Sequence, residues 1–335
     1  MGARRYVRRA SRIVCFSLAI LGFACSAENT TVSTDTNSVP DSVTPTTPPG
    51  IDLPDVVVTY SVLAAIVEEL VEGHADVVTL IPDGLDPHDF EPSAKDVEAM
   101  NNAAIIVANG LDLEEGLTDA LANTAESGTK VFYVADHVTT LAVVDVNDHS
   151  DHGHSHAGAD SSSDSDHEHG TDPHIWLSAH TLREALPELG LALSSALSVD
   201  LADRTTEFDA QLLDLDDEIV EKFASLTKCQ LVTGHNELAY FANRYGCKVI
   251  AAVLSSPSTH AEATASNIEF VIDVVKTHDA KVVFTSMGTN PALAEQVARG
   301  AGATVVEINT HFLGSSTTYA EFLLNLADTI ESNLR

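Results

Sequence analysis

Short apolar segments alternate with amphipathic helical segments along most of this chain, and this alternation restricts the possible folds more than any other feature. In the first series, helices are predicted over 61–73, 93–101 and 113–125, the second with Ser93 as its N-cap. The apolar runs between them are 55–60, 75–82, 103–109 and 130–136. Continuous apolar runs that alternate with helices predict a parallel sheet covered by helices on both faces.

A second series of the same kind fills the C-terminal part of the chain. Its apolar runs are 229–233, 247–253, 280–286 and 303–308, and its helical segments are 236–246, 261–277, 291–301 and the region from Thr318 onward. Between the two series, segment 199–226 contains no Gly or Pro and carries an apolar stripe of helical spacing: Leu201, Phe208, Leu212, Leu215, Ile219 and Phe223. We therefore expect an α/β protein of two lobes, each a mostly parallel four-stranded sheet flanked by helices, joined by one long connecting helix.

The first 50 residues differ in character from the rest. Residues 1–24 combine a basic start with a short apolar run, too short to span a bilayer, and predict a signal peptide. Cys25 follows small residues and is the candidate lipidation site of a bacterial lipoprotein. Gly22 stands where a lipobox normally has Leu, so ordinary secretion is the alternative. Residues 25–50, rich in Ser, Thr and Pro, predict a disordered tether.

These features place the mature protein outside the cytoplasm, either at the cell surface or in a periplasm, with an anchor at Cys25. The balance of charge argues against one class of partner. With 17 Lys and Arg against 50 Asp and Glu, the net charge is −33, and nucleic acid is excluded because phosphate binding needs clustered basic residues. So acidic a chain attracts cations at long range, although solubility or a saline habitat explains the charge equally well.

Domain boundaries follow from these patterns. We expect an N-terminal lobe at 51–178, a connecting helical region at 179–227 and a C-terminal lobe at 228–335. The first lobe includes a disordered loop, 147–170, in which Asp and Ser surround six histidines: His149, His152, His154, His156, His167 and His169. Such a segment cannot fold alone but can bind Zn²⁺ weakly in many arrangements. A simple spacer is the alternative.

Four other histidines stand just beyond strands or at the junction of the lobes: His88, His174, His235 and His311. Ligands of open parallel sheets bind beyond the carboxyl ends of the strands, so these side chains are expected to converge on the cleft as a metal site. A site of imidazoles alone favours zinc, since manganese prefers more carboxylate oxygen. Five further histidines are interpreted as solvated residues: His74, His137, His180, His260 and His278. Trp176 is interpreted as a packing residue against the long helix.

Cys229 and Cys247 each begin a strand-like run. If those strands are parallel neighbours, the two residues lie side by side and a disulfide can form in an oxidising compartment. Two free buried thiols are the alternative.

The chain also resembles a known family, the substrate-binding proteins of bacterial zinc and manganese ABC transporters that have a rigid connecting helix. The stretches that carry the resemblance are GLDPHDFEPSAKDV, AAIIVANGLDLEEGL, DPHIWLS, TGHNELAYFANRYG, AEATASNIEFV and TYAEFLLNLADTI. The histidine-rich insertion before DPHIWLS resembles that of the zinc-uptake branch. The resemblance implies that His88, His174 and His235 are ligands. The family commonly has Asp in a D-x-L-G pattern as the fourth ligand, or leaves the position to water, whereas this chain has HFLG and therefore His311.

The function implied is capture of Zn²⁺ outside the cytoplasm and its delivery to an ABC permease and its ATPase, by a monomer that is not an enzyme. Zinc is then the transported ligand, and Mn²⁺ or Fe²⁺ transport is the alternative within the class. An adhesin or an extracellular zinc buffer is a second alternative. A secreted zinc hydrolase, with Glu91 as its base, is the least favoured because HxxE is not the HExxH motif of metalloproteases.

Overall fold

The computed structural model describes residues 53–144, 146–147 and 170–335. All of them belong to one compact unit, which spans 51–335. The predicted signal peptide, Cys25 and the tether lie outside the described residues, as do the six histidines of the predicted loop. Asn147, the first residue of that loop, is described and buried, and its side-chain amide donates to the carbonyl oxygen of Ala252 at 2.7 Å.

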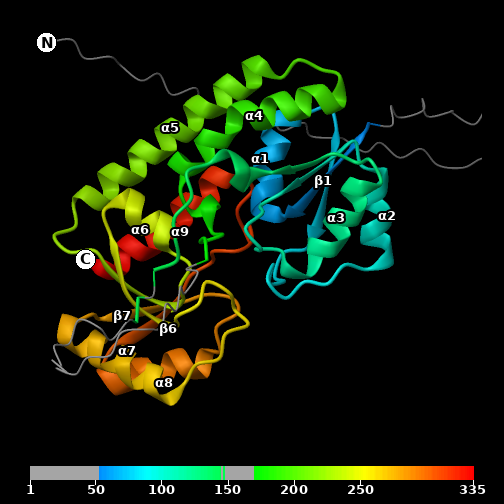
Figure 1. The fold of residues 1–335 in the computed structure, drawn as a ribbon. Coiled ribbons are helices and arrows are strands. Elements are labelled where there is room, and N and C mark those ends of the chain that lie inside the picture. Colours follow the sequence, from blue (N-terminus) through cyan, green and yellow to red (C-terminus); the bar gives the residue numbers. More distant parts are fainter. Residues whose placement is uncertain (1–52, 145, 148–169) are drawn as a thin grey trace, which may run out of the picture. The chain divides into compact units, whose positions relative to one another are not determined.

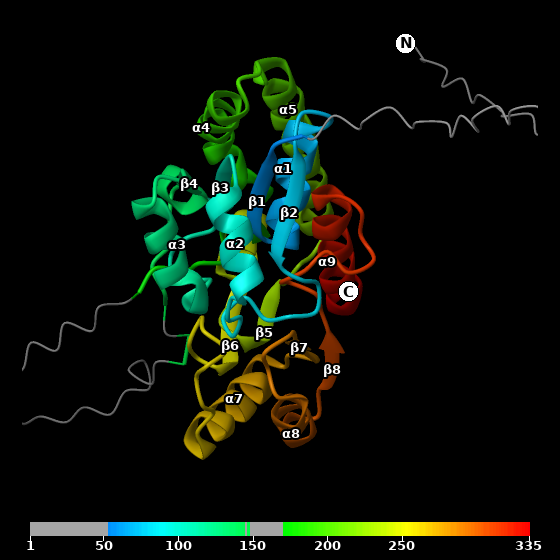
Figure 2. The same cartoon turned by 90° about the vertical axis from the view of Figure 1, so that its right-hand side faces the viewer.

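The first half contains the parallel four-stranded sheet that the sequence predicts, with the order β2-β1-β3-β4 (Figure 2). Its strands are β1 (Asp55–Tyr60), β2 (Asp76–Ile81), β3 (Ile105–Ala108) and β4 (Val131–Tyr133). Its helices are α1 (Ser61–Val71), α2 (Ala94–Asn102), η1 (Glu115–Leu117), α3 (Thr118–Glu126) and η2 (Val134–His137). Five consecutive residues of β1 are buried, so helices cover both faces of this central strand. Ser93 caps α2 in a reciprocal capping box with Asp96.

The second half also alternates strands and helices. Its strands are β5 (Gln230–His235), β6 (Lys248–Leu254), β7 (Val282–Thr285) and β8 (Thr304–Glu307). Its helices are α6 (Ala239–Tyr245), α7 (Ala265–His278), α8 (Pro291–Ala301) and α9 (Tyr319–Leu334). The strands form two parallel hydrogen-bonded pairs, β5-β6 and β7-β8, rather than the single ladder that was predicted, and β5 lies beside β7. The α/β class is confirmed, and the difference lies in the hydrogen bonding between the middle strands.

Two helices form the region between the halves: α4 (Ala179–Leu197) and α5 (Ala202–Ala224), which run alongside each other (Figure 1). The helix predicted over 199–226 is thus α5, and its apolar stripe is buried as expected. Gly190 lets the two helices approach closely, because a Cβ atom at this position would lie 2.3 Å from Oγ1 of Thr205. Helix α5 contacts α1 of the first half and α6 and α9 of the second half. Its role as a rigid connection stays a prediction.

Before α4, the chain forms the short helix η4 (Ile175–Leu177), which is fully buried. A disulfide joins Cys229 and Cys247 at the beginning of β5 and β6, which is one of the two alternatives that the sequence left open. Among the described helices, none combines the length and the apolar character that crossing a bilayer requires.

Candidate metal centre

The structure brings together the four histidines that the sequence singled out. His88 lies in the loop after β2, His174 directly before η4, His235 at the end of β5 and His311 in the loop after β8. Each offers one ring nitrogen to a cluster in which these atoms all lie within 4.8 Å of one another. All four side chains are buried, the most exposed at 2%. This spacing suits a single ion bound by several imidazoles.

The loops that carry His88 and His174 share a local design, because both contain the tripeptide Asp-Pro-His. In each, the Asp carboxyl group accepts the backbone N–H of the histidine two residues later, at 3.0 Å for Asp86 and 2.9 Å for Asp172. This turn is typical of Asp and fixes the direction in which the following side chain leaves the backbone. The sequence repeats the tripeptide at 86–88 and 172–174, so the similarity of the two turns was predictable.

Hydrogen bonds on the far side of the rings determine which nitrogen faces the cluster. Nδ1 of His174 lies 2.8 Å from Oδ1 of Asp172, and Nδ1 of His311 lies 2.8 Å from Oγ1 of Thr310. The Nε2 atoms of His174, His235 and His311, together with both ring nitrogens of His88, are buried without a hydrogen-bond partner among the described residues. An unpaired buried polar atom costs about 1–3 kcal/mol. So many of them at one point indicate that a ligand belongs there.

The electrostatic environment keeps three of these imidazoles, those of His88, His235 and His311, neutral. Burial, followed by repulsion from His174 and His260, lowers the pKa of His88 to about 3. Burial and the neighbouring imidazoles also lower the pKa of His235 and His311 well below 6.5. Only the neutral ring has a lone pair to give to a metal ion, so at neutral pH these three rings are ready to bind one.

A carboxyl group that sequence reasoning missed lies against the cluster. Glu237 is fully buried, and its Oε2 is 3.6 Å from Nε2 of His235 and 3.8 Å from Nδ1 of His311. Burial raises the pKa of Glu237 to about 7, although hydrogen bonds from Ser286 and Thr310 act in the opposite direction. The available signal was its position, since an acidic residue directly after a buried strand and before an apolar helix is unusual.

Trp176 is fully buried, and its ring neighbours in the described chain are two histidines of the cluster and Tyr60. Its packing against the long helix stays a prediction. Its ring centroid lies 5.3 Å from that of His174 and 6.0 Å from that of His311, and Tyr60 lies on it at 5.0 Å. Its Nε1–H donates to the carbonyl oxygen of Thr310 at 2.7 Å. This hydrogen bond connects the loop that carries His311 to the segment that carries His174.

The other histidines that the structure describes do not belong to the cluster. His74, His137 and His180 are exposed, and His278 is half-buried beside Gln230. His260 is exposed too, but its Nε2 faces the carbonyl oxygen of His88 at 3.0 Å. A hollow of about 280 Å³ borders His88 and is lined in part by Asp112, Glu115 and Ser258. Its acidic lining suits the approach of a cation.

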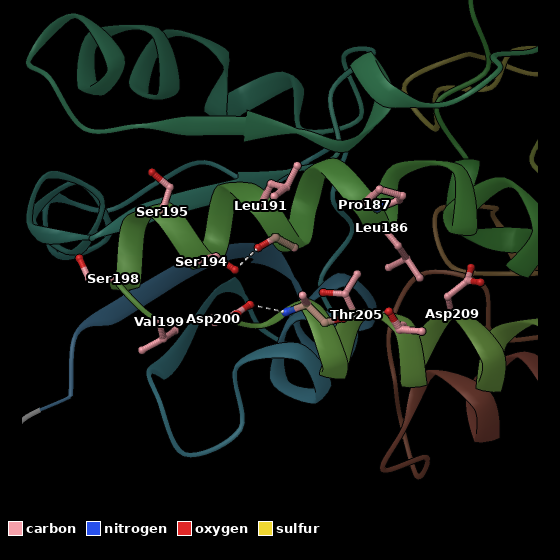
Figure 3. A pocket seen from close by; sticks show the side chains of 13 residues that line it. Leu186, Pro187, Leu191, Ser194, Ser195, Ser198, Val199, Asp200, Thr205 and Asp209 are labelled. Atoms are coloured by element: carbon pink, nitrogen blue, oxygen red, sulfur yellow. Dashed lines mark hydrogen bonds between the residues drawn. The ribbon is translucent and has the colours of Figure 1, made fainter.

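Two other places fit metal chemistry less well. Glu91, the base that a hydrolase would need, is exposed and does not belong to the histidine cluster. A larger hollow of about 820 Å³ lies along α4 and α5 and is lined in part by Leu186, Leu191, Val199 and Thr205 (Figure 3). No histidine or cysteine lines it, so it lacks the ligands that zinc prefers.

Comparison with known proteins agrees with this geometry. The family model of the periplasmic component A of zinc-uptake complexes matches residues 56–333. The chain is 24% identical to the manganese-binding lipoprotein of Halalkalibacterium halodurans, over 96% of this chain and 98% of that protein. It is 26% identical to the high-affinity zinc uptake system protein of Bacillus subtilis, over 83% of this chain and 85% of that protein.

Among solved structures, the fold is similar to that of the periplasmic zinc-binding protein of Treponema pallidum. The TM-score is 0.69 at 24% identity, with 84% of this chain and 99% of that chain covered. The family model covers far more than half of the sequence. The chain therefore belongs to the family of the periplasmic component A of zinc-uptake complexes.

Proposed function

We propose that this protein captures Zn²⁺ outside the cytoplasm and delivers it to the permease of an ABC transporter for zinc uptake. The observation that carries the proposal is the cluster of four buried imidazoles whose ligand atoms lie within 4.8 Å of one another. Zinc accepts tetrahedral coordination by imidazole, at about 2.0–2.1 Å per bond. Four protein ligands leave no open position for water, which suits capture and transport but not hydrolysis.

Family membership carries the coarser statement. The chain is a metal-binding, substrate-binding component of an ABC transporter of the class that handles zinc, manganese or iron, and it is not an enzyme. Such components lie outside the cytoplasm and act together with a permease and an ATPase. The choice of zinc over manganese rests on the ligands, because His311 brings nitrogen where manganese would favour a carboxylate oxygen.

The manganese-binding lipoprotein among the relatives favours manganese as the second candidate. The naming of that relative as a lipoprotein also supports the proposal that Cys25 is acylated and holds the protein on the membrane. We further propose the N-terminal lobe at 51–178, the connecting region at 179–227 and the C-terminal lobe at 228–335, and a monomer as the working form. The histidine-rich loop is proposed to collect zinc weakly near the site.

Elemental analysis of protein purified without added metal, followed by competition with a chromophoric zinc chelator, tests the function. We expect one tightly bound Zn²⁺ per chain, and weaker additional sites that disappear when residues 149–169 are deleted. This deletion keeps Asn147, whose amide is bonded to the carbonyl oxygen of Ala252. Loss of the tight site on deletion of the loop would contradict the proposed division of roles, and tighter binding of Mn²⁺ than of Zn²⁺ would contradict the choice of metal.

A further inference from the structure

Glu237 is a buried acidic residue whose role the four-histidine site does not by itself explain. Its side chain is 0% exposed and follows His235 by two residues. Oε1 accepts the hydroxyl of Ser286 at 2.6 Å, and Oε2 accepts the hydroxyl of Thr310 at 2.5 Å. Among the described residues, its neighbours at ion-pair distance are the imidazoles of His235 and His311. No arginine or lysine of the described chain compensates this carboxyl group within 4 Å.

Both hydroxyl groups donate to Glu237, as they must when Glu237 is ionised, because a carboxylate can only accept. Thr310 must therefore give its single proton to Glu237, and its remaining lone pairs face Nδ1 of His311 at 2.8 Å. A hydroxyl oxygen that has given away its proton can bind Nδ1 only if Nδ1 carries a hydrogen. His311 is thereby held as the Nδ1–H tautomer, which leaves the lone pair on Nε2 free for a ligand.

Ser286 repeats this arrangement for His235 with a longer contact. Its hydroxyl donates to Oε1 of Glu237, and its oxygen lies 3.5 Å from Nδ1 of His235. Ser286 and Thr310 are themselves buried, at 5% and 1% exposure, so water does not readily take their place. The two hydroxyl groups thus connect one carboxyl group to two of the four imidazoles, and the link to His311 is the shorter one.

We propose that Glu237 is a positioning residue that acts through the hydroxyl groups of Thr310 and Ser286 to hold His311 and His235 with Nε2 free to bind the metal ion. The inference rests on the proposed function for the identity of the ion, but its effect on the tautomers does not require a bound ion. Outer hydrogen-bond partners of this kind fix the ring orientation and raise the basicity of the ligand.

The same carboxyl group also contributes charge where a divalent cation would be buried. Four neutral imidazoles cannot offset two positive charges, and an uncompensated charge away from water is costly. Asp172, at 2% exposure, lies beside His174, and Glu237 lies beside His235 and His311. The two carboxyl groups therefore lie beside different rings of the site, and neither belongs to the four side chains that offer ligand atoms.

The test compares the zinc affinity of the full chain with three variants and one control. Glu237→Gln keeps the shape but adds an amide N–H₂ group, which must donate to one hydroxyl and reverse it. Thr310→Val removes the hydroxyl at constant volume, and Thr310→Ser restores it. We expect zinc affinity to fall about 10- to 100-fold in Glu237→Gln and Thr310→Val, and to stay within about threefold of the wild type in Thr310→Ser.

Glu114→Gln is the matched control, because Glu114 is also a buried carboxyl group that accepts a threonine hydroxyl, Oγ1 of Thr59 at 2.6 Å. Within the described part of the chain, its carboxyl group accepts from Thr59, Asn109 and Gly110 and from no histidine, so its variant should bind zinc as the wild type does. Thermal unfolding of the metal-free proteins shows whether each variant folds. If Glu237→Gln does not fold, the pair Thr310→Val and Thr310→Ser carries the test.

Nuclear magnetic resonance of ¹⁵N-histidine-labelled, metal-free protein gives a readout that a purely structural role would not change. The wild type should show the Nδ1–H tautomer at His311, and Glu237→Gln and Thr310→Val should show a mixture of tautomers there. His174, which Asp172 holds, should stay unchanged. An unaltered tautomer and an unaltered zinc affinity in both variants would overturn the proposal. Absence of tight zinc binding in the wild type would instead overturn the proposed function, and the tautomers would still decide the role of Glu237.

Discussion

The carboxyl group of Asp172 accepts two hydrogen bonds from His174: one from the backbone N–H at 2.9 Å and one from Nδ1 of the ring at 2.8 Å. Both end on the same oxygen, Oδ1, so a single atom fixes the backbone and the ring of one candidate ligand. Asp86 makes only the first of these contacts with His88. The two turns are thus similar in backbone and different in what they do to the imidazole.

This difference gives the first prediction. Asp172→Asn keeps an acceptor oxygen but removes the charge that supports the donating Nδ1–H of His174, so zinc affinity should fall about 10-fold or more. Asp86→Asn is the control, because the carboxyl group of Asp86 binds the backbone of His88. Its effect should stay within about threefold. Equal losses in both variants, measured by chelator competition, would contradict the separate role assigned to Asp172.

The second prediction concerns pH. Burial lowers the pKa of His88 to about 3, and lowers those of His235 and His311 well below 6.5. The unfolded chain therefore binds more protons than the metal-free folded protein below pH 6.5. The contribution of these three rings to stability should be fully present above pH 6.5 and should fall as the pH drops toward 3, by at most about 1.4 kcal/mol per pH unit for each histidine. The raised pKa of Glu237 acts in the opposite direction as the pH drops below about 7.

Urea unfolding of the metal-free protein at pH 7, 6, 5 and 4.5 measures this dependence. His88→Gln removes one of the groups and should make the decline shallower, whereas His180→Gln, which changes an exposed histidine, should leave it unchanged. A decline that is as steep in His88→Gln as in the wild type would show that the ring of His88 does not resist protonation. Zinc affinity should likewise persist below pH 6.5, where a site of exposed imidazoles would lose its metal.

Much of the fold was predictable because central strands such as β1 and β3 are buried on both faces. Runs such as Val56–Val58 are uninterrupted by polar residues, and the run that contains it marks β1 to the residue. The run 130–136 was longer than its strand, Val131–Tyr133. Helix ends were less certain. The helix predicted from Ala261 begins at Ala265, because Thr264 accepts a hydrogen bond from Asn267 N–H as its N-cap. The long helix begins at Ala202, since Ser198 takes a left-handed conformation after α4.

The site, like the fold, was predictable from the sequence only in part. The gathering of the four histidines followed from their positions beyond the ends of strands, a rule of parallel sheets. The environment of Glu237 did not, because its partners are Ser286 and Thr310, 49 and 73 residues away. Their meeting depends on β5 lying beside β7 and on the loop after β8 turning back toward them. No local pattern contains that information, so such a contact has to come from the three-dimensional structure.

The third prediction concerns the disulfide between Cys229 and Cys247, which closes a loop of 18 residues at the start of β5 and β6. Replacing both residues by Ala should lower the free energy of unfolding by about 3 kcal/mol in the chain-entropy model. The bond is at the beginning of β5 and the candidate ligand His235 is at its end, so zinc stoichiometry should not change. Denaturant unfolding with and without reductant measures the first effect. Full labelling of both thiols in native, unreduced protein would contradict the bond.

The last prediction separates His311 from the other three histidines. His311→Ala should weaken zinc binding but keep the site, because three imidazoles with water complete a tetrahedron. His88→Ala and His235→Ala should cost more affinity, since each takes away a ring from one half of the chain and leaves the others with too few ligands. His311→Asp should restore much of the zinc affinity and shift the relative preference toward Mn²⁺, because carboxylate oxygen suits the harder ion.

The position of Glu237 gives a more specific expectation for His311→Asp. Its Oε2 lies 3.8 Å from Nδ1 of His311, so an aspartate at 311 would bring a second carboxyl group close to a buried one. The repulsion between the two should weaken His311→Asp in the absence of metal, and a bound cation should relieve it. Thermal unfolding with and without Zn²⁺ or Mn²⁺ should therefore show a larger metal-induced rise in Tm for His311→Asp than for His311→Ala. Zinc affinity that is unchanged in His311→Ala would mean that the site has three histidine ligands and that His311 only packs beside them.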